Sequence, residues 1–513
     1  MADQRSETPR PVKVYDTLSG DKHELEPLEP GKIKMYVCGV TVYDLTHIGH
    51  ARVFIVFDVV QRFLRHAGYD VTYVRNHTDV DDKIIERANE VGRDPLELAQ
   101  GFIEELDRDM DALLVEHADV EPRVSEEIDA IIEMNEKLLD KGHAYVADGD
   151  VYYRVESFEG YGKLSNRKLE DMEAGRSGRV DEDDGDSKKE NPFDFALWKK
   201  SKEGEPAWDS PWGKGRPGWH IECSVMSTKY LGPTFDIHGG GRDLVFPHHE
   251  NEIAQSEGAT DQPFARNWMH VGMVNVAEEV DGEKVERKMS KSLGNFWTTR
   301  DVLGGFHPEA IRYFMHTTQY RKPITYSLDN LEEATRRMEY LYSTLKRIDE
   351  TLERGGMERG SVPPANLLYG NIQETVEGFS ERFDEALADD FNTSRALAAI
   401  SDVAKVANEL TESNEEPSAE LAATIDRIAH DLIAAGEILG ILQREPEVAL
   451  EEIRKLKVES LELDASEIDE LVAEREQARA DQDWDRADEI RDQLADMGIE
   501  IMDSPEGSEW RVK

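Results

Sequence analysis

Near its N-terminus the sequence has the apolar pattern of a strand, a helix and a second strand. Residues 33–38 form a short apolar run with aromatic and β-branched side chains, which predicts a buried strand. Apolar residues recur at steps of three and four over 51–67, Gly68 ends the predicted helix, and 71–74 predict a second strand. Such a unit has parallel strands. We therefore expect an α/β fold built on a Rossmann-type parallel sheet.

The rest of the chain divides into segments of different pattern. Residues 85–145 have helical periodicity, 145–155 alternate as a hairpin does, and 170–192 predict a solvated loop. After residue 330, alanine-rich helical runs with breaks at 355–368 and 413–418 predict a helical bundle. The C-terminal end predicts a helical hairpin followed by two short strands.

The charge balance is strongly acidic. The 513 residues include 61 Lys and Arg against 109 Asp and Glu, a formal net charge of −48. This charge argues against a basic surface that surrounds nucleic acid and against attachment to an anionic membrane. Because the acidic residues are spread along the whole chain, we favour adaptation to high salt, a halophilic surface, over a protein that avoids polyanions.

The cellular compartment is indicated by cysteine usage and by the absence of targeting patterns. Two cysteines exclude a disulfide framework and fit a reducing cytoplasm. The N-terminal sequence MADQRSETPR has no apolar signal region, and no apolar run reaches the ~18 residues of a membrane span. We therefore expect a cytoplasmic protein with no membrane segment.

Residues 38–50, CGVTVYDLTHIGH, occupy the first predicted strand-to-helix turn, where open α/β sheets bind nucleotides. His47, Gly49 and His50 lie at or just before the predicted helix N-terminus. Such a terminus attracts phosphate, glycine allows close backbone approach, and two imidazoles can donate hydrogen bonds. Two polar turn histidines without a role fit the spacing equally well.

A second motif, KMSKS, spans residues 288–292. Lys288 and Lys291 suit a mobile loop that closes on polyphosphate, because two point charges can follow a leaving pyrophosphate. Short runs of lysine and serine are common, so the motif gains weight only beside the histidine segment in an α/β chain.

Both cysteines can belong to one metal site. In FPHHENE, residues 246–252, His248 and Glu252 are four positions apart and share a helix face. Soft and borderline ligands of this kind suit Zn²⁺. The candidate set is Cys38, Cys223, His248 and Glu252. His249 and His238 are competing ligands, and two unrelated buried cysteines beside a polar helix start are the alternative.

A fourth region joins GWHIECS, residues 218–224, and IHGGGRDLVF, residues 237–246. Glycines 239–241 can cradle a nucleotide through their backbone amides, although three glycines alone are weak evidence. Trp219 fits either a pocket wall or the core, and the core is the commoner place for a single tryptophan.

Together these motifs resemble the cysteinyl-tRNA synthetases, which are class I aminoacyl-tRNA synthetases. The resemblance runs from about residue 12 to the C-terminus. It rests on YVCGVTVYDLTHIGHAR, NHTDVDDKII, NPFDFALWK, GWHIECSVM, DIHGGGRDLVFPHHENEIAQS, KMSKSLGN and DWDRADEIRDQLADMGIE. The acidic stretch 277–286 before KMSKS and the acidic loop 181–190 depart from the family pattern, but neither touches a motif.

The resemblance implies roles for individual residues. Family zinc ligands fall on Cys38, Cys223, His248 and Glu252, and the ATP-site residues fall on His47, Gly49, His50, Lys288 and Lys291. Residues at positions that contact cysteine or its adenylate in the family are Thr41, Thr78, Trp219, Asp243 and His248. His238 and His249 would support the zinc ligands from outside.

The resemblance also implies an architecture and an activity. The expected units are two Rossmann halves at 1–120 and 213–330, a connective insertion at 121–212, an anticodon-binding helical bundle at 331–460 and a small C-terminal domain at 461–513. The expected reaction is ligation of L-cysteine to tRNA(Cys) by a cytoplasmic monomer, using ATP with Mg²⁺ and one Zn²⁺ per chain.

Two other functions remain open at this point. A related ligase joins activated cysteine to the amine of a small amino-sugar, but it would lack the helical region after residue 330. A non-catalytic zinc protein that binds RNA would not need both the histidine segment and KMSKS. Cysteine-dependent exchange of pyrophosphate into ATP separates the three.

Overall fold

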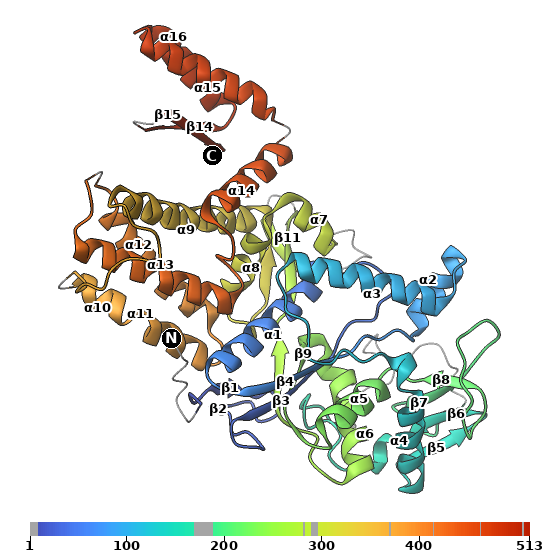
Figure 1. Ribbon diagram of the computed structural model, residues 1–513. Coiled ribbons are helices and arrows are strands. Elements are labelled where there is room, and N and C mark those ends of the chain that lie inside the picture. The colour runs from blue at the N-terminus through green and yellow to red at the C-terminus, as the bar shows by residue number, and fades with distance from the viewer. Residues whose placement is uncertain are drawn as a thin grey trace.

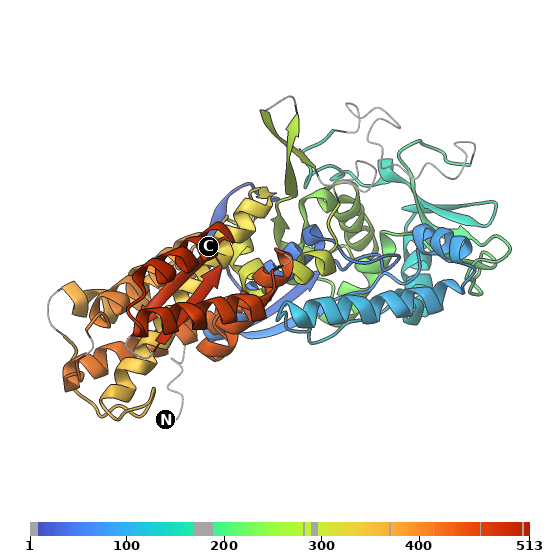
Figure 2. The ribbon, with the colours of Figure 1, turned by 90° about the horizontal axis from the view of Figure 1, so that it is seen from above.

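The computed structural model has a central α/β domain, an inserted antiparallel sheet, a helical bundle and a small C-terminal unit (Figure 1). Figure 2 shows the bundle and the inserted sheet at opposite ends of the α/β domain. The structure describes residues 9–168, 188–280, 283–288, 296–368, 371–413, 415–461, 463–504 and 507–512. None of the helices in these ranges combines the length and the apolar character needed to cross a membrane.

The central sheet has four parallel strands in the order β10-β9-β3-β4. The strands are β3 (Lys32–Val37), β4 (Asp70–Arg75), β9 (Phe235–Gly241) and β10 (Ala265–Val271). The first two are the strands predicted from the apolar runs, and the prediction is confirmed. Successive strands are added outwards from β3 on one side and from β9 on the other. The topological switch point, where open sheets bind ligands, therefore lies between β3 and β9.

Helix α1 (Ile48–His66) connects β3 to β4 and begins three residues earlier than its apolar pattern predicts. The reason is its cap: the Nδ1 atom of His47 accepts hydrogen bonds from the backbone amides of Gly49, at 3.1 Å, and His50, at 3.2 Å. Both amides are among those that a helix start leaves without partners. One face of α1 packs on the sheet and another on the bundle, so the helix lies between these two bodies (Figure 1).

The predicted helical stretch 85–145 is wrong for its middle part. The structure has α2 (Asp82–Val91), α3 (Pro95–Ala112) and α4 (Ile128–Asp140). Helix α3 ends because Leu114 adopts a left-handed conformation with φ of 59°. The chain then runs extended, and Val120 and Arg123 pair with Val74 and His77 at the edge of the sheet. Pairing with this edge overrides the local helical periodicity.

The inserted sheet is antiparallel, in the order β5-β6-β7-β8. Its strands are β5 (Ala144–Ala147), β6 (Asp150–Tyr153), β7 (Phe195–Lys200) and β8 (Gly215–Pro217). The hairpin predicted over 145–155 is confirmed as β5 and β6. This sheet shares an apolar core with α4, α5 (Ile221–Leu231) and α6 (Glu250–Thr260). Most of the predicted loop 170–192, including its acidic part, lies outside the described residues.

The acidic stretch 277–286 lies in a hairpin of β11 (Val274–Val280) and β12 (Glu283–Lys288), apart from residues 281–282, which are outside the described residues. Strand β13 (Ile324–Tyr326) pairs in parallel with β11. Two helices follow the KMSKS segment, α7 (Thr299–Gly305) and α8 (Pro308–His316). Near the N-terminus, β1 (Lys13–Tyr15) and β2 (Lys22–Glu24) form a separate hairpin.

The bundle predicted after residue 330 is confirmed. Its helices are α9 (Leu328–Arg354), α10 (Asn371–Glu377), α11 (Phe379–Ala388), α12 (Thr393–Leu410), α13 (Ala419–Leu439) and α14 (Pro446–Ser460). The breaks predicted at 355–368 and 413–418 fall between helices. Apolar side chains of the bundle and of α1 form one continuous core.

The C-terminal unit is the predicted helical hairpin followed by two strands. It consists of α15 (Ala465–Ala480), α16 (Trp484–Asp496), β14 (Ile499–Ser504) and β15 (Gly507–Val512). It has its own small core, which includes Ile468, Ile490 and Trp510. Figure 1 shows this unit extending beyond α14, away from the parallel sheet.

Candidate active site

The predicted metal ligands meet at the switch point of the sheet. Cys38 directly follows β3, and its backbone amide donates to the Gly239 carbonyl of β9 at 3.0 Å. Cys223 lies on α5, Glu252 on α6, and His248 on the helical turn that leads into α6. One ligand atom of each of these four residues lies within 4.8 Å of those of the other three, and all four residues are buried.

The glutamate is at the centre of this cluster. The Sγ atom of Cys38 donates to Glu252 Oε1 at 3.4 Å, and His248 Nε2 lies 3.2 Å from the same oxygen. The i, i+4 spacing therefore places His248 and Glu252 together, as the sequence predicts. His238 Nε2 lies 2.8 Å from Glu252 Oε2, and His249 Nε2 lies 3.9 Å from Oε1.

The burial and the shifted pKa values of the cluster residues favour the binding of a cation. Burial raises the pKa of the Cys38 thiol well above its usual value, and the neighbouring Cys223 and Glu252 raise it further. Burial lowers the pKa of His248 to about 3, so this imidazole is neutral and has a lone pair to offer. Buried carboxylates and thiolates need a positive partner, and a soft divalent metal is the partner that sulfur, imidazole and carboxylate share.

A second combination of ligands is also close enough to hold a metal. It is Cys38, His238, His249 and Glu252, and it contains both competing histidines of the sequence analysis. The two sets share Cys38 and Glu252. Only the first set uses both cysteines of the chain, and thiolate is the softest ligand available.

Three polar residues around the cluster were not singled out from the sequence. Asn76 Oδ1 accepts from the Gly39 amide at 2.9 Å and lies 3.7 Å from the Cys223 sulfur. His220 Nδ1 lies 3.0 Å from His248 Nδ1. Glu222 accepts from the Thr78 hydroxyl at 2.9 Å, and burial raises its pKa well above the usual value. All three lie in quoted motifs, and for His220 and Glu222 the available signal was their place close to Cys223 in the sequence.

Among the remaining predicted substrate positions, Trp219 contacts His248 of the cluster, and Thr78 contacts Glu222, which precedes Cys223. Thr41 and Thr78 pair as a β-bridge beyond the ends of β3 and β4. The ring of Trp219 is half-buried and lies 4.5 Å from the ring of His248, so this tryptophan lines the site and is not a core residue. Asp243 is exposed just after the end of β9.

The glycines of β9 are explained by packing. A Cβ atom on Gly239 would lie 2.2 Å from the Phe57 ring, and one on Gly240 would lie 2.9 Å from His249. Gly39 has an even closer neighbour, because a Cβ atom there would lie 1.7 Å from the backbone oxygen of Asn76. These glycines let strands and side chains approach closely at the end of the sheet.

His47 and His50 lie together at the N-terminus of α1, with ring centroids 3.7 Å apart. The residues that follow KMSKS lie beside them. The Ile48 amide donates to the Trp297 carbonyl at 3.3 Å, and the Thr299 amide donates to the Thr46 carbonyl at 2.8 Å. The segment that carries KMSKS therefore returns to the histidine motif. Lys288 is the last residue of β12, whereas Lys291 lies outside the described residues.

This fold, with two histidines at the start of α1 and the residues that follow KMSKS hydrogen-bonded beside them, defines a class I aminoacyl-tRNA synthetase. Residues 24–336 match the family model described as tRNA synthetases class I (C) catalytic domain. A solved methionyl-tRNA synthetase from Mycobacterium tuberculosis superposes with a TM-score of 0.59 at 16% identity, covering 82% of this chain and 93% of that one. A putative arginyl-tRNA synthetase from Campylobacter jejuni gives 0.54, also at 16% identity, over 80% of this chain and 94% of that one.

Full-length relatives identify the family within this class. The cysteine–tRNA ligase of Geobacter metallireducens is 51% identical over 505 residues, which is 98% of this chain and 100% of the relative. The enzyme of the same name from Geobacter sulfurreducens is 50% identical over the same coverage. Residues 382–443 match a DALR domain, and 464–511 match the cysteinyl-tRNA ligase anticodon binding domain. The chain belongs to the cysteine–tRNA ligase family.

Proposed function

We propose that this protein is a cysteine–tRNA ligase. It activates L-cysteine with ATP to cysteinyl-adenylate and then transfers the cysteinyl group to the 3'-terminal ribose of tRNA(Cys). The observation that carries this proposal is the buried cluster of Cys38, Cys223, His248 and Glu252 at the switch point, beside the histidine motif of α1. Relatives with this name align with nearly the whole chain.

The cluster would hold one Zn²⁺ and select the substrate by its sulfur. Serine differs from cysteine by one atom, and a shaped cavity gains only ~1–3 kcal/mol from such a difference. When bound, zinc would bind the substrate thiolate, which a serine hydroxyl cannot match. Trp219 would form a wall of the cysteine pocket, and Thr41, Thr78 and Asp243 would contact cysteine or its adenylate. His238 and His220 would orient Glu252 and His248.

The phosphate side of the reaction needs positive charge and no general base. The cysteine carboxylate is already an anion, and it attacks the α-phosphorus of ATP while pyrophosphate leaves. His47, Gly49 and His50 would bind the phosphates at the N-terminus of α1. Lys288 and Lys291 would stabilise the departing pyrophosphate together with the Mg²⁺ that accompanies ATP. A ribose hydroxyl of the tRNA then attacks the adenylate carbonyl, and AMP leaves.

We propose that the helical region binds the tRNA with few phosphate contacts. Among the described residues, several cations of its first helix and of the tail already contact other side chains of the protein: Arg336 and Arg337 contact Glu333, Arg347 contacts Asn408, and Arg486 contacts Glu474 and Glu489. The glutamates offset part of the positive charge that Arg336, Arg337 and Arg486 would offer to a phosphate backbone. Recognition would therefore rest on contacts to bases, which tolerate salt better than phosphate contacts do.

The proposed division of labour follows the predicted units. Residues 1–120 and 213–330 would carry the chemistry, 121–212 would be the connective insertion, 331–460 the anticodon-binding bundle and 461–513 the C-terminal domain. We further propose a cytoplasmic monomer. The same helical units argue against ligation to an amino-sugar, which needs no anticodon reader.

The test measures two reactions of the full chain. Cysteine-dependent exchange of pyrophosphate into ATP should occur without tRNA, and cysteine should be transferred to tRNA(Cys) at both low and high KCl. Serine is the matched control, and it should support neither reaction. Absence of exchange would leave only a binding protein, and transfer to an amino-sugar but not to tRNA would establish the other ligase.

A further inference from the structure

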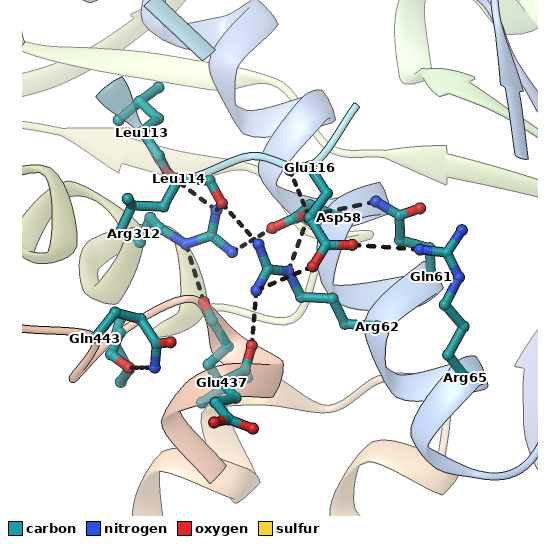
Figure 3. Close-up of polar contacts among 12 residues, drawn as sticks. Asp58, Gln61, Arg62, Arg65, Leu113, Leu114, Glu116, Arg312, Glu437 and Gln443 are labelled. Atoms are coloured by element: carbon teal, nitrogen blue, oxygen red, sulfur yellow. Dashed lines mark hydrogen bonds and ion pairs between the residues drawn. The ribbon is translucent and has the colours of Figure 1, made fainter. Parts of the chain in front are cut away.

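A buried ion pair joins the active-site helix to the second half of the α/β domain. Asp58 lies on α1 and Arg312 on α8, and Arg312 Nη2 lies 2.6 Å from Asp58 Oδ2. Both side chains are 0% exposed. Figure 3 shows the guanidinium of Arg312 surrounded by Asp58 and by backbone carbonyls from other segments. Nothing in the proposed chemistry uses this pair.

The same guanidinium also binds the helical bundle. Its Nε donates to the Leu439 carbonyl at the end of α13 at 3.0 Å, and its Nη1 donates to the Leu113 carbonyl after α3 at 3.0 Å. One side chain thus connects α8 with three other segments. The first is α1, the second follows α3, and the third belongs to the bundle.

Arg62 makes a parallel set of contacts one turn further along α1. Its Nε lies 3.0 Å from Asp58 Oδ1, its Nη1 donates to the Glu437 carbonyl of α13, and its Nη2 donates to the Leu114 carbonyl, both at 2.8 Å. Two guanidinium groups therefore hold one carboxylate of α1 and the last turn of α13 together (Figure 3).

The end of α13 is shaped around this contact. Gly440 has φ of +66°, and a Cβ atom there would lie 2.3 Å from the guanidinium of Arg312. A glycine thus both ends the helix and leaves room for the arginine. Burial disfavours the charged form of Asp58, but Arg312 and Arg62 outweigh this effect and lower its pKa. The pair is therefore ionised in the folded protein.

Stability alone does not account for such a pair. Replacing a buried ion pair by well-packed apolar side chains is often neutral or stabilising, because desolvation costs about as much as the attraction returns. Apolar contacts are also non-directional, whereas the seven hydrogen bonds of Arg62 and Arg312 define a position. Asp58 lies eleven positions after His47, about 16 Å along the helix axis at 1.5 Å per residue. A helix is rigid over this distance, so a shift at Asp58 is a shift at His47.

We propose that Asp58, Arg62 and Arg312 are positioning residues that hold α1 in register with the end of α13 and thereby place His47 and His50 for ATP. The inference rests on the proposed role of these histidines. It also predicts different effects on the binding of the two substrates, ATP and cysteine. The metal cluster is built from the end of β3, α5 and the start of α6, and none of its residues lies on α1. Disturbing the contacts of either arginine should therefore weaken ATP binding and leave cysteine binding unchanged.

Two variants test this without leaving a bare buried charge. Arg62→Ala removes the contacts of Arg62 with Asp58, Glu437 and Leu114 but keeps the Asp58–Arg312 pair. The Arg62 side chain is 16% exposed. Arg312→Lys keeps the positive charge beside Asp58 but cannot reach the carbonyls of Leu439, Leu113 and Leu114 together, all of which the guanidinium contacts. The matched control is Arg321→Ala. Arg321 binds the buried Asp390 of the α11–α12 connection at 2.8 Å, so its loss cuts another contact to the bundle that does not involve α1.

The readout is calorimetric titration of the full chain, with ATP and Mg²⁺ in one series and with L-cysteine in another. Arg62→Ala and Arg312→Lys should raise the Kd for ATP about tenfold, since small displacements of binding groups cost this much or more. The Kd for cysteine should stay within about twofold, and Arg321→Ala should change neither constant. A merely structural role would lower the fraction of active protein and leave both constants unchanged.

The outcomes separate this inference from the proposed function. An unchanged Kd for ATP in folded Arg62→Ala overturns the inference, as does an equal effect of Arg321→Ala. If Arg312→Lys does not fold, Arg62→Ala alone decides. Wild-type protein that binds ATP but shows no cysteine-dependent exchange refutes the proposed function, while the ATP titrations still decide the role of the pair.

Discussion

Gly39 offers a sharp test of the active-site geometry. It lies between Cys38 and the start of the histidine segment, and the structure gives a Cβ atom no space there. The nearest atom, the backbone oxygen of Asn76, would be 1.7 Å away, and the Asn76 carbonyl carbon would be 2.8 Å away. Both are backbone atoms, so no side-chain rotation can relieve the clash of Gly39→Ala.

The size of the effect follows from these distances. Ordinary van der Waals contact begins at 3.4 Å, so the two segments must separate by about 1.7 Å. Overpacking of this kind costs about 1–3 kcal/mol of folding free energy, which a chain of this size tolerates. The catalytic cost should be larger, because a misplacement of ~1 Å can reduce a rate ~10²-fold. Asn76 would also lose its hydrogen bond from the Gly39 amide.

The assay is cysteine-dependent pyrophosphate exchange, with thermal unfolding and metal content measured on the same preparation. Gly39→Ala should lower kcat/KM at least ~10²-fold while remaining folded. Gly101→Ala is the control: it lies in α3 with no atom within 4 Å of the new Cβ, and it should be fully active and slightly more stable. A folded Gly39→Ala protein with wild-type kcat/KM would refute the packing at the end of β3.

Further predictions concern the metal, Lys291, the tail and the pH dependence of stability. Cys223→Ser should lose most of the bound zinc and much of its preference for cysteine over serine, and full zinc with full selectivity would contradict the ligand set. Lys291→Ala should lower kcat for exchange ~10²-fold or more with little change in cysteine binding, whereas an unaltered kcat would exclude a transition-state role. Deleting 466–513 should weaken aminoacylation far more than exchange, and an equal loss of both would show that the tail only supports the fold. Burial lowers the pKa of His316 to about 3, whereas an unfolded histidine titrates near ~6.5. The unfolded chain therefore takes up this proton first, and stability present above pH ~6.5 is lost as the pH falls towards ~3. His316→Gln, whose amide can still donate to the Leu439 carbonyl, should reduce the loss by about 2 kcal/mol at pH ~5, as measured by denaturant unfolding.

The sequence predicts the local parts of this protein well, because they are encoded by neighbouring residues. The period of the apolar side chains predicts β3, α1 and β4, and the i, i+4 rule predicts the contact between His248 and Glu252. The chemistry of the side chains predicts that two cysteines, a histidine and a glutamate belong together. Each of these inferences uses either one segment or the rarity of cysteine in the chain.

Contacts between distant segments were not predictable in the same way. The chain after Leu114 leaves the helical pattern because it pairs with the edge of the sheet, which no local signal announces. His220 and Asn76 reach the metal cluster from different elements, and their motifs give no hint of the direction in which each side chain points.

Asp58 illustrates the difference between what the sequence predicts and what only tertiary packing determines. It occurs on the buried side of α1 among apolar residues, and a carboxylate in such a place requires a cation. The sequence therefore predicts a cationic partner for Asp58. Helix periodicity suggests only Arg62, four positions away, for this role. The second partner, Arg312, is 254 positions further along the chain and meets Asp58 only because α8 packs against α1. The part of the site that sets the position of α1 is thus fixed by tertiary packing, whereas the part that binds substrate can be inferred from residue chemistry.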